Sequence, residues 1–341
     1  MFGTKPKYDF VGIGDTVTDA FIRLNISSAH VEMDHGSGKE ICMRFGDKIP
    51  YDSVTVVPGV GNAANATVSA SRLGLRVAFV SNVGDDEHGR EILDVFKKEN
   101  VDDKFIQIHK GIPTNYHYVL WYGDERTILI KHQKYDYKLP DIGDPKWVYF
   151  SSVGENTENF HKELENYLTA HSSIKLAVQP GTVQMKMGAE KLAGIYRRTD
   201  LFFCNKDEAQ RILKIEEQDI KKLLQGITSL GPKIVAITDG VKGAYAYDAS
   251  TSLSTSGQMF FMPPFPDPKP PLQRTGAGDA FSSTVTVALA LGLSLVDALR
   301  WGPINSMSVV QGIGARQGLL SREKLGEFLA KAPADYYPRP I

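Results

Sequence analysis

Short apolar segments rich in β-branched and aromatic residues alternate along the chain with longer segments whose apolar residues recur at helical spacing. In the stretch 87–100, Ile92, Leu93 and Phe96 share one helix face, while Lys97 and Lys98 point away from it. The helical pattern predicts helices at 63–73, 87–100, 158–170, 188–198, 206–213, 218–230, 276–291, 295–312 and 321–330. The apolar segments predict strands at 10–14, 77–82, 147–152, 174–179, 201–205, 233–238 and 244–248. This alternation favours an α/β fold with a mainly parallel central sheet flanked by helices, which binds ligands at the carboxyl ends of its strands.

Two stretches interrupt the alternation. Residues 20–58 contain strand-like pieces at 21–26, 41–45 and 54–57 between polar turns, and residues 116–132 are predicted as two strands around a turn at 123–125. We interpret the two stretches as a small β-sheet that covers a site as a lid. The sequence thus predicts an α/β domain made of 1–19, 59–114 and 133–341, and a β lid made of 20–58 and 115–132.

Composition narrows the class of protein. Among the 341 residues, 39 Lys and Arg stand against 40 Asp and Glu, and the formal charge of -1 gives no broad attraction for nucleic acid. The two cysteines, Cys42 and Cys204, are too few for a disulfide framework and favour a reducing compartment. No apolar run reaches the roughly 18 residues that a membrane span needs. We expect a cytoplasmic protein with neither a nucleic-acid nor a membrane partner.

The strongest chemical signal is the sequence RTGAGDAF at 274–281, which leads into a helix of small residues. Two glycines at a helix start allow backbone N–H groups to reach an anion without interference from side chains. A carboxylate inside such a turn repels a phosphate that is merely bound, so Asp279 fits better as the base that takes a proton from an attacking hydroxyl. The amides of Gly276, Ala277 and Gly278 would then stabilise the transferred phosphoryl group. The structural alternative is a glycine-rich loop in which Asp279 caps the helix.

A second glycine-rich segment, VPGVGNAAN, lies at 57–65. Gly59, Gly61 and Ala64 match the G-x-G-x-x-A pattern of dinucleotide-binding proteins, and the predicted flanking strands supply a βαβ unit. An NAD(P)-dependent oxidoreductase is therefore an alternative interpretation. Against it, the following strand ends in Ser-Asn, without an acidic residue to hold a ribose. Asn62 and Asn65 add amides that suit a polyhydroxylated substrate.

Two weaker patterns follow later strands. Asn205 and Glu208 combine an amide and a carboxylate at the end of a strand, which suits a water-mediated site for magnesium and phosphate. The same two residues also fit a helix capping box, and both interpretations can hold at once. The segment 238–244 joins two strands and exposes backbone to a flat ligand such as a nucleotide base, or else forms a plain hairpin turn.

Together these segments resemble the PfkB, or ribokinase-like, family of carbohydrate kinases over residues 9–329. The stretch 72–102 is similar to the first family signature, 275–281 to the core of the second, Asn205 and Glu208 to the N-x-x-E motif, and Gly314-Ala315 to a late Gly-Ala turn. The resemblance implies a Rossmann-like ribokinase fold with a small β-sheet lid. It also implies transfer of the γ-phosphate of ATP to an alcohol, with Mg²⁺.

The resemblance assigns roles by position. It implies that Asp279 is the general base and that the anion hole comprises Gly276, Ala277 and Gly278. It implies that substrate hydroxyls are bound by Asp19, whose carboxylate can accept from two neighbouring hydroxyls, together with Gly61, Asn62 and Asn65. The nucleotide site would comprise Asn205, Glu208, Thr238, Gly240 and Gly243, with Glu208 reaching the metal through water.

The chain departs from the family pattern at several positions. Gln273-Arg274 replaces a usual Asp-Thr, and that Asp commonly helps to hold an activating monovalent cation. We therefore expect little dependence on potassium, with Arg274 as a fixed positive charge beside the phosphates. Gln179 stands where many members have an Asp, and Pro303 stands where an Asn near the adenine is common.

The acceptor is less defined by the sequence. A sugar hydroxyl is the first expectation from the resemblance, and Lys131 and His132 in the lid suit a carboxylate or phosphate on an acidic sugar. Tyr116 and Trp121 would instead stack on a base in a nucleoside kinase of the same fold. A non-catalytic ligand-binding protein is a third class. The alternating apolar residues at 116–122 also allow a homodimer through the lid.

Overall fold

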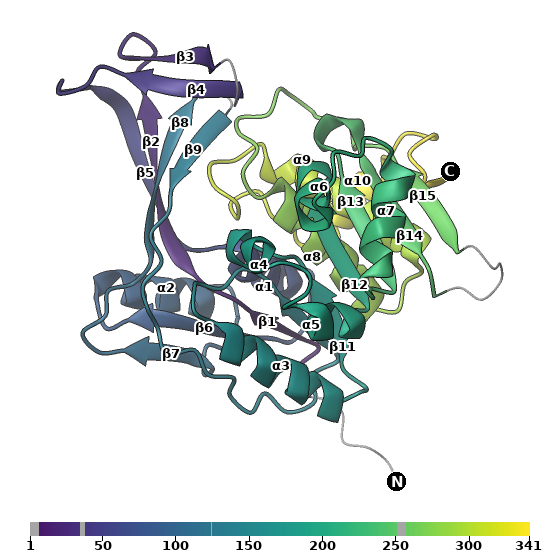
Figure 1. The fold of residues 1–341 in the computed structure, drawn as a ribbon. Coiled ribbons are helices and arrows are strands. Elements are labelled where there is room, and N and C mark those ends of the chain that lie inside the picture. The colour runs from purple at the N-terminus through teal and green to yellow at the C-terminus, as the bar shows by residue number, and fades with distance from the viewer. Residues whose placement is uncertain (1–6, 35–37, 124, 251–256) are drawn as a thin grey trace.

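The computed structural model describes residues 7–34, 38–123, 125–250 and 257–341 (Figure 1). Ten strands form the central sheet, in the spatial order β16 (Arg339–Pro340), β15 (Gln258–Met262), β14 (Ala244–Asp248), β13 (Ile234–Thr238), β12 (Leu201–Asn205), β11 (Lys175–Val178), β10 (Trp147–Phe150), β1 (Phe10–Ile13), β6 (Val77–Gly84) and β7 (Ile106–His109). The strands from β13 to β7 in this order pair in parallel, and β14, β15 and β16 continue the sheet antiparallel. The prediction of a mainly parallel sheet is confirmed.

Helices cover both faces of this sheet, because successive residues of each parallel strand are buried on opposite sides. One core lies under α1 (Asn62–Arg72), α2 (Glu87–Lys98), α8 (Ala277–Ala290), α9 (Leu295–Val309) and α10 (Arg322–Ala330). The other lies under α3 (Glu158–Ala170), α5 (Ala193–Arg198), α6 (Lys206–Leu213) and α7 (Ile220–Ser229). In β10, for example, Tyr149 joins the first core and Val148 the second.

A smaller sheet lies beside the α/β body, in the order β5 (Tyr51–Val60), β2 (Val17–Leu24), β8 (Tyr116–Tyr122) and β9 (Glu125–Leu129) (Figure 1). A two-stranded ribbon of β3 (Ala29–Asp34) and β4 (Gly38–Met43) extends beyond it. These strands come from the two stretches that interrupt the helix–strand alternation, except that β2 begins before the first stretch and β5 ends after it. We keep the division into an α/β domain and a lid as a proposal, since β2 and β5 run across its limits.

Several local expectations differ from the structure. The segment 188–198 is predicted as one helix, but Gly188, at φ 85°, ends a separate short helix, α4 (Thr182–Met187), and α5 starts only at Ala193. The predicted strand at 41–45 is β4, which ends at Met43, and Phe45 is exposed. The strand β7 is absent from the prediction because only its end residues, Ile106 and His109, are buried, which leaves a weak apolar signal.

The predicted βαβ unit around the G-x-G-x-x-A sequence is wrong. The strand before α1 is β5, which pairs antiparallel with β2 in the small sheet, whereas the strand after α1, β6, pairs with β1 in the central sheet. Because the two strands belong to different sheets, Gly59 and Gly61 do not form a dinucleotide-binding turn. Within the residues that the structure describes, no helix has the length and apolar character of a membrane span.

Candidate active site

The order of the central strands reverses at β1, since β6 lies on one side of it and β10 on the other. The segments after β1 and β10 meet there, and the backbone N–H of Asp15 donates to the carbonyl of Ser152 at 2.7 Å. Ligands of open α/β sheets bind at such a switch point. A cavity of about 1430 Å³ opens here between the strand ends and the small sheet, and this volume exceeds the upper range of roughly 1,000 Å³ for a single drug-sized ligand.

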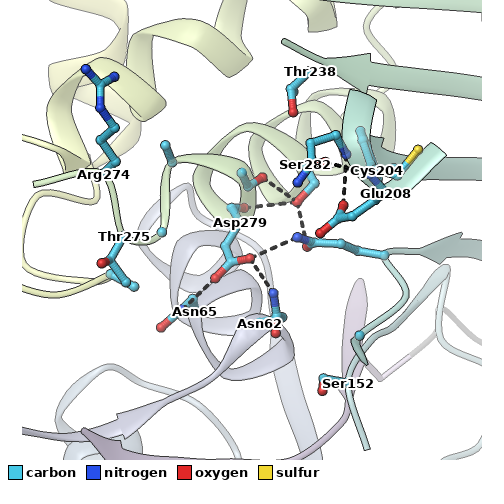
Figure 2. A pocket seen from close by; sticks show the side chains of 18 of the residues that line it. Asn62, Asn65, Ser152, Cys204, Glu208, Thr238, Arg274, Thr275, Asp279 and Ser282 are labelled. Atoms are coloured by element: carbon cyan, nitrogen blue, oxygen red, sulfur yellow. Dashed lines mark hydrogen bonds between the residues drawn. The ribbon is translucent and has the colours of Figure 1, made fainter. Parts of the chain in front are cut away.

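Asp279 occupies the middle of this cavity, in the first turn of α8, and its side chain is held by amides from two other elements (Figure 2). Asn62 donates from Nδ2 to Oδ1 of Asp279 at 2.8 Å, and Asn65 donates from Nδ2 to Oδ2 at 2.8 Å. Both asparagines lie at the start of α1, one helical turn apart, so they face the same carboxylate. The structure therefore brings together three residues that the sequence singled out in separate segments.

Gln179, directly after β11, supplies a third amide. Its Nε2 donates to Oδ1 of Asp279 at 2.9 Å, and its Oε1 accepts from the hydroxyls of Tyr149 and Ser282. Burial, reinforced by the charge of Asp279, raises the pKa of the Tyr149 phenol well above its usual value, so Tyr149 remains a donor. The sequence marked Gln179 only as a departure from a family pattern. Its position at the carboxyl end of a predicted parallel strand could have indicated a site residue, because ligands of such sheets bind there.

The helix start next to Asp279 is open to the cavity. Gly276 is the N-cap residue of α8, adopts φ 82° and offers no side-chain cap to the first backbone N–H groups. A side chain at this position would place its Cβ 2.5 Å from Cα of Ala315, so the late Gly-Ala turn packs directly against the loop. The N–H groups of Ala277 and Gly278 have no partner within the helix, and both residues line the cavity.

The small sheet and the segments next to it supply a second polar group of residues. The carboxylate of Asp19 on β2 faces His117 on the neighbouring strand β8, with Nδ1 of His117 3.6 Å from Oδ1 of Asp19. Asp15 accepts from the hydroxyl of Tyr137 at 2.8 and 2.9 Å and faces Nδ1 of His132 at 3.4 Å. Burial raises the pKa of Tyr137 far above its usual value, and the charge of Asp15 adds to the effect.

Several buried polar atoms around this part of the cavity lack hydrogen-bond partners among the residues described. They are Oδ1 of Asp19, Oδ1 of Asn65, Nδ2 of Asn115, Nε2 of His117 and Nδ1 of His132. All five residues line the cavity. Buried polar groups are normally satisfied, and leaving one unpaired costs roughly 1–3 kcal/mol. These atoms thus form a set of donors and acceptors available to a polar ligand.

At the opposite end of the cavity, Asn205 and Glu208 form a capping box at the start of α6. The side chain of Asn205 accepts from the N–H of Glu208 at 2.8 Å, and Oε2 of Glu208 accepts from the N–H of Asn205 at 2.8 Å. Burial raises the pKa of Glu208, and the nearby charge of Asp279 adds to it. The second Glu208 oxygen makes no hydrogen bond among the described contacts, which leaves a hard oxygen ligand for a cation.

The turn between β13 and β14 completes this end. Thr238 closes β13. Gly240 begins a short 3-10 turn, η1 (Gly240–Lys242), and Gly243 follows it, within an antiparallel hairpin. The sequence left a hairpin turn and a nucleotide border as alternatives. The segment is a hairpin turn, and all three residues also line the cavity.

Gln273 lies buried beneath the glycine-rich loop. Its Nε2 points at three backbone carbonyl oxygens, those of Gly312 at 3.0 Å, Gly314 at 3.3 Å and Thr275 at 3.4 Å. Such a ring of carbonyl oxygens is the kind of donor set that binds a monovalent cation. Because the neutral amide already donates to it, these residues do not fit a bound cation.

The aromatic residues expected to stack on a nucleobase lie elsewhere. Trp121 is buried, donates from its indole N–H to the carbonyl of Gly123 at 2.9 Å and packs under the guanidinium of Arg23. Tyr116 packs against His88, with ring centroids 4.7 Å apart. Neither Trp121 nor Tyr116 is among the residues lining the cavity, whereas Lys131 and His132 are.

Comparison with known proteins agrees with this geometry. The family model for pfkB family carbohydrate kinases matches residues 9–322. Ribokinase of Bacillus subtilis (strain 168) is 28% identical over 294 residues, which cover 84% of this chain and 92% of that protein. The structure of Arabidopsis thaliana ribokinase complexed with ribose and ATP matches with a TM-score of 0.76 and 17% identity, over 94% of this chain and 98% of that one.

A nucleoside kinase of Methanocaldococcus jannaschii, an archaeal member of the ribokinase family, also shares the fold. Its TM-score is 0.72 at 19% identity, over 94% of this chain and 98% of that one. The expected ribokinase-like architecture is therefore confirmed, and the oxidoreductase alternative loses its structural basis with the missing βαβ unit. The family model spans nearly the whole sequence, and the chain belongs to the pfkB family of carbohydrate kinases.

Proposed function

We propose that this protein transfers the γ-phosphate of ATP to a hydroxyl of a sugar or sugar-like acceptor, with Asp279 as the general base. One observation carries the proposal: the Asp279 carboxylate and the open backbone N–H groups of Ala277 and Gly278 face one cavity from the same helix start. A base beside an anion-binding turn is what phosphoryl transfer to an alcohol requires. A protein that only binds a phosphate gains nothing from a carboxylate there.

The hydrogen bonds to Asp279 indicate where the proton goes. Oδ1 already accepts from two amides and Oδ2 from one, and a carboxylate oxygen has about two lone-pair sites. Oδ2 therefore keeps one site for the acceptor hydroxyl. As the acceptor oxygen bonds to the γ-phosphorus, the bond from that phosphorus to the bridging oxygen breaks, and its electron pair leaves with ADP. The hydroxyl proton passes to Oδ2 of Asp279.

Negative charge on the transferred group is stabilised by the start of α8. The N–H groups of Gly276, Ala277 and Gly278 would form the anion hole, and the helix dipole places partial positive charge at the same point. A Cβ atom at Gly278 would come no closer than 3.9 Å to Nε2 of Gln179, so the role of Gly278 rests on its exposed N–H rather than on packing. Arg274 lines the same cavity and adds a full positive charge near the phosphates.

The nucleotide phosphates would lie toward Asn205 and Glu208, with the base near Thr238, Gly240 and Gly243. The half-buried Glu208 carboxylate suits a water-mediated Mg²⁺, because partial burial and Asp279 disfavour its charge in the absence of a cation. Mg²⁺ bound to the phosphates would neutralise part of their charge during transfer. Glu208 would orient the water shell, and Asn205 would keep Glu208 in place through the capping box.

The acceptor side of the cavity favours a polyol. Asp19, Asn65, Asn115, His117 and His132 present unpartnered donors and acceptors there, and a hydroxylated ligand can satisfy both kinds. A nucleoside needs an apolar face for its base, and Tyr116 and Trp121 do not provide one in this cavity. Lys131 at the same edge makes an acidic sugar the second candidate.

We also propose that the protein forms a homodimer through the outer face of the lid. The register places Val56, Ala20, Tyr118 and Leu129 in one row across the small sheet, and Val54 shares their side. Val56, Tyr118 and Leu129 are each close to half exposed. An exposed apolar sheet face of this kind is typical of a protein–protein contact.

The test of the kinase proposal is turnover of magnesium-ATP with a panel of sugars, sugar acids and nucleosides, using Asp279→Ala and Asp279→Asn beside the wild type. We expect one acceptor class to be phosphorylated and both variants to lose about 10²- to 10⁴-fold in kcat, the usual contribution of a general base. ATP binding by calorimetry should persist in both variants. Turnover retained in Asp279→Asn would contradict the assigned base, and ATP binding without turnover of any acceptor would favour a ligand-binding protein.

A further inference from the structure

The ribbon of β3 and β4 stands apart from both sheets. It pairs with neither the central sheet nor the four-stranded sheet, and it lies at the far end of the lid from the α/β body (Figure 1). A two-stranded ribbon alone is at best marginally stable in water. Its side chains must therefore supply additional contacts across the two strands.

One face of this ribbon carries metal-ligating side chains. The antiparallel register places His30 opposite Cys42 and Glu32 opposite Glu40, and directly opposite residues point to the same side. One nitrogen of His30, one carboxylate oxygen of Glu32 and the sulfur of Cys42 all lie within 4.8 Å of one another. Across the part of the chain that the structure describes, this is the sole group of three such residues. Nε2 of His30 is already 2.8 Å from Oε1 of Glu32.

The electrostatics of this face favour a cation. Two carboxylates directly opposite each other repel and destabilise an antiparallel pair. A divalent cation reverses this effect, because it attracts both carboxylates and can also bind a thiolate sulfur.

We propose that the β3–β4 ribbon binds a zinc ion through Sγ of Cys42, a ring nitrogen of His30 and a carboxylate oxygen of Glu32, with water or Glu40 as the fourth ligand. A mixed sulfur, nitrogen and oxygen set is typical of four-coordinate Zn²⁺, whereas Mg²⁺ takes oxygen ligands only. On binding, the thiol releases its proton to solvent and the sulfur–zinc bond forms. No oxidation or reduction is involved.

The geometry allows closure around the ion. Tetrahedral Zn²⁺ with bonds of about 2.0–2.3 Å sets ligand atoms roughly 3.3–3.8 Å apart, and the three atoms already lie within 4.8 Å of one another. The side chains of His30 and Glu32 are 62% and 64% exposed and can rotate without repacking the core. None of the three residues lines the active-site cavity, so this site is separate from the magnesium site. A bound ion would stabilise the outer end of the lid by linking β3 to β4.

Cobalt(II) is the probe that reports the sulfur ligand directly. We expect titration of the full chain with CoCl₂, with a phosphine reductant present, to give a near-ultraviolet thiolate-to-cobalt band and tetrahedral visible bands that saturate at one equivalent. Addition of ZnCl₂ should remove the near-ultraviolet band and the visible bands, because zinc displaces cobalt from the site. Since Cys42 and Cys204 are the two cysteines of the sequence, Cys42→Ser should remove the band and the matched Cys204→Ser should keep it.

Two further variants make the result independent of any folding defect in Cys42→Ser. His30→Ala and Glu32→Gln keep the thiol, and we expect each to weaken cobalt binding about tenfold or more, as loss of a ligand does. Absence of a charge-transfer band in the wild type would overturn the proposal. So would a band that survives in Cys42→Ser, or an octahedral cobalt spectrum without sulfur ligation.

Discussion

Gln179 and Asp279 are joined by a hydrogen bond of 2.9 Å from Nε2 of the amide to Oδ1 of the carboxylate. The amide is oriented by its other end, because Oε1 accepts from Tyr149 and Ser282 and so turns Nε2 toward Asp279. The relationship links β11 to the start of α8. It makes Gln179 a positioning residue for the proposed base.

Replacing Gln179 by Met removes the N–H donor to Asp279 and keeps a side chain of nearly the same size. A hydrogen bond to a charged group contributes about 1.5–3 kcal/mol, so we expect kcat to fall roughly 10- to 100-fold. The KM for ATP should change little, because Gln179 holds the carboxylate rather than the nucleotide. Steady-state kinetics with Gln258→Met, at an exposed position of β15 outside the cavity, as the control would check this. An unchanged kcat would show that Asn62 and Asn65 suffice to hold Asp279.

Potassium should have little effect on this kinase. The amide of Gln273 already donates to the carbonyls of Gly312, Gly314 and Thr275, so no ring of free oxygens is left for a cation. Turnover measured in potassium and in tetramethylammonium chloride at equal ionic strength should agree. In Gln273→Asp the acceptor oxygens lose their donor, and we expect turnover to become dependent on potassium. Strong potassium activation of the wild type would contradict this account of Gln273.

The ionised carboxylate of Glu208 should lower the free energy of unfolding at neutral pH. Its folded-state pKa lies above the ordinary value of 4.5, so the folded state binds more protons than the unfolded state as the pH rises from 4.5 through the raised value. Stability is lost over that range, and the loss persists at pH 7. Gln can still accept from the N–H of Asn205 in the capping box. We therefore expect Glu208→Gln to raise the melting temperature at pH 7 but not below pH 4.5.

The same variant should bind magnesium-ATP less well, since its carboxylate is lost. Thermal unfolding across pH, together with the KM for magnesium-ATP, would separate the two effects. A lower melting temperature at pH 7 would mean that the charge of Glu208 stabilises the fold. Glu323→Gln, which likewise removes a carboxylate from the first turn of a helix, α10, is the matched control.

Substitutions of Asp19 and His117 should weaken binding of the acceptor and leave binding of ATP unchanged. Both residues line the cavity away from the capping box, and Oδ1 of Asp19 and Nε2 of His117 accept or donate no hydrogen bond among the described residues. We expect Asp19→Asn and His117→Ala to raise the KM for the acceptor roughly 10- to 100-fold, because each loses about 1.5–3 kcal/mol of hydrogen bonding. The KM for ATP should stay close to the wild-type value. A parallel rise in both constants would place these residues outside the acceptor site.

Tyr118→Glu should convert a dimer into monomers. The new charge would lie in the middle of the apolar row formed with Val56 and Leu129, where burial without a partner is unfavourable. Light scattering of the wild type and the variant measures the change directly. Tyr337→Glu, at an equally exposed tyrosine outside the lid, is the comparison variant and should leave the oligomeric state unchanged. A wild-type monomer would remove the proposed interface.

The sequence by itself determined the alternation of strands and helices and the two stretches that leave it. It also marked the glycine-rich turn with Asp279 and the Asn205–Glu208 pair. These features are local: helical and strand periodicity, helix-start glycines and a capping pattern each extend over a few residues, so neighbouring side chains are enough to reveal them.

Tertiary structure decided which distant elements meet. The sequence left two interpretations of the strand at 54–57, a lid strand or the first strand of a βαβ unit, and the pairing of β5 with β2 decided between them, because a strand has the same pattern in either sheet. Local apolar character could not show that Tyr149 of β10 donates to Gln179, directly after β11, and that Gln179 in turn donates to Asp279. The same holds for His30 and Cys42, which become neighbours only through the register of β3 and β4. Pairing and register depend on contacts between residues far apart in the chain, and those contacts exist only once the sheets have formed.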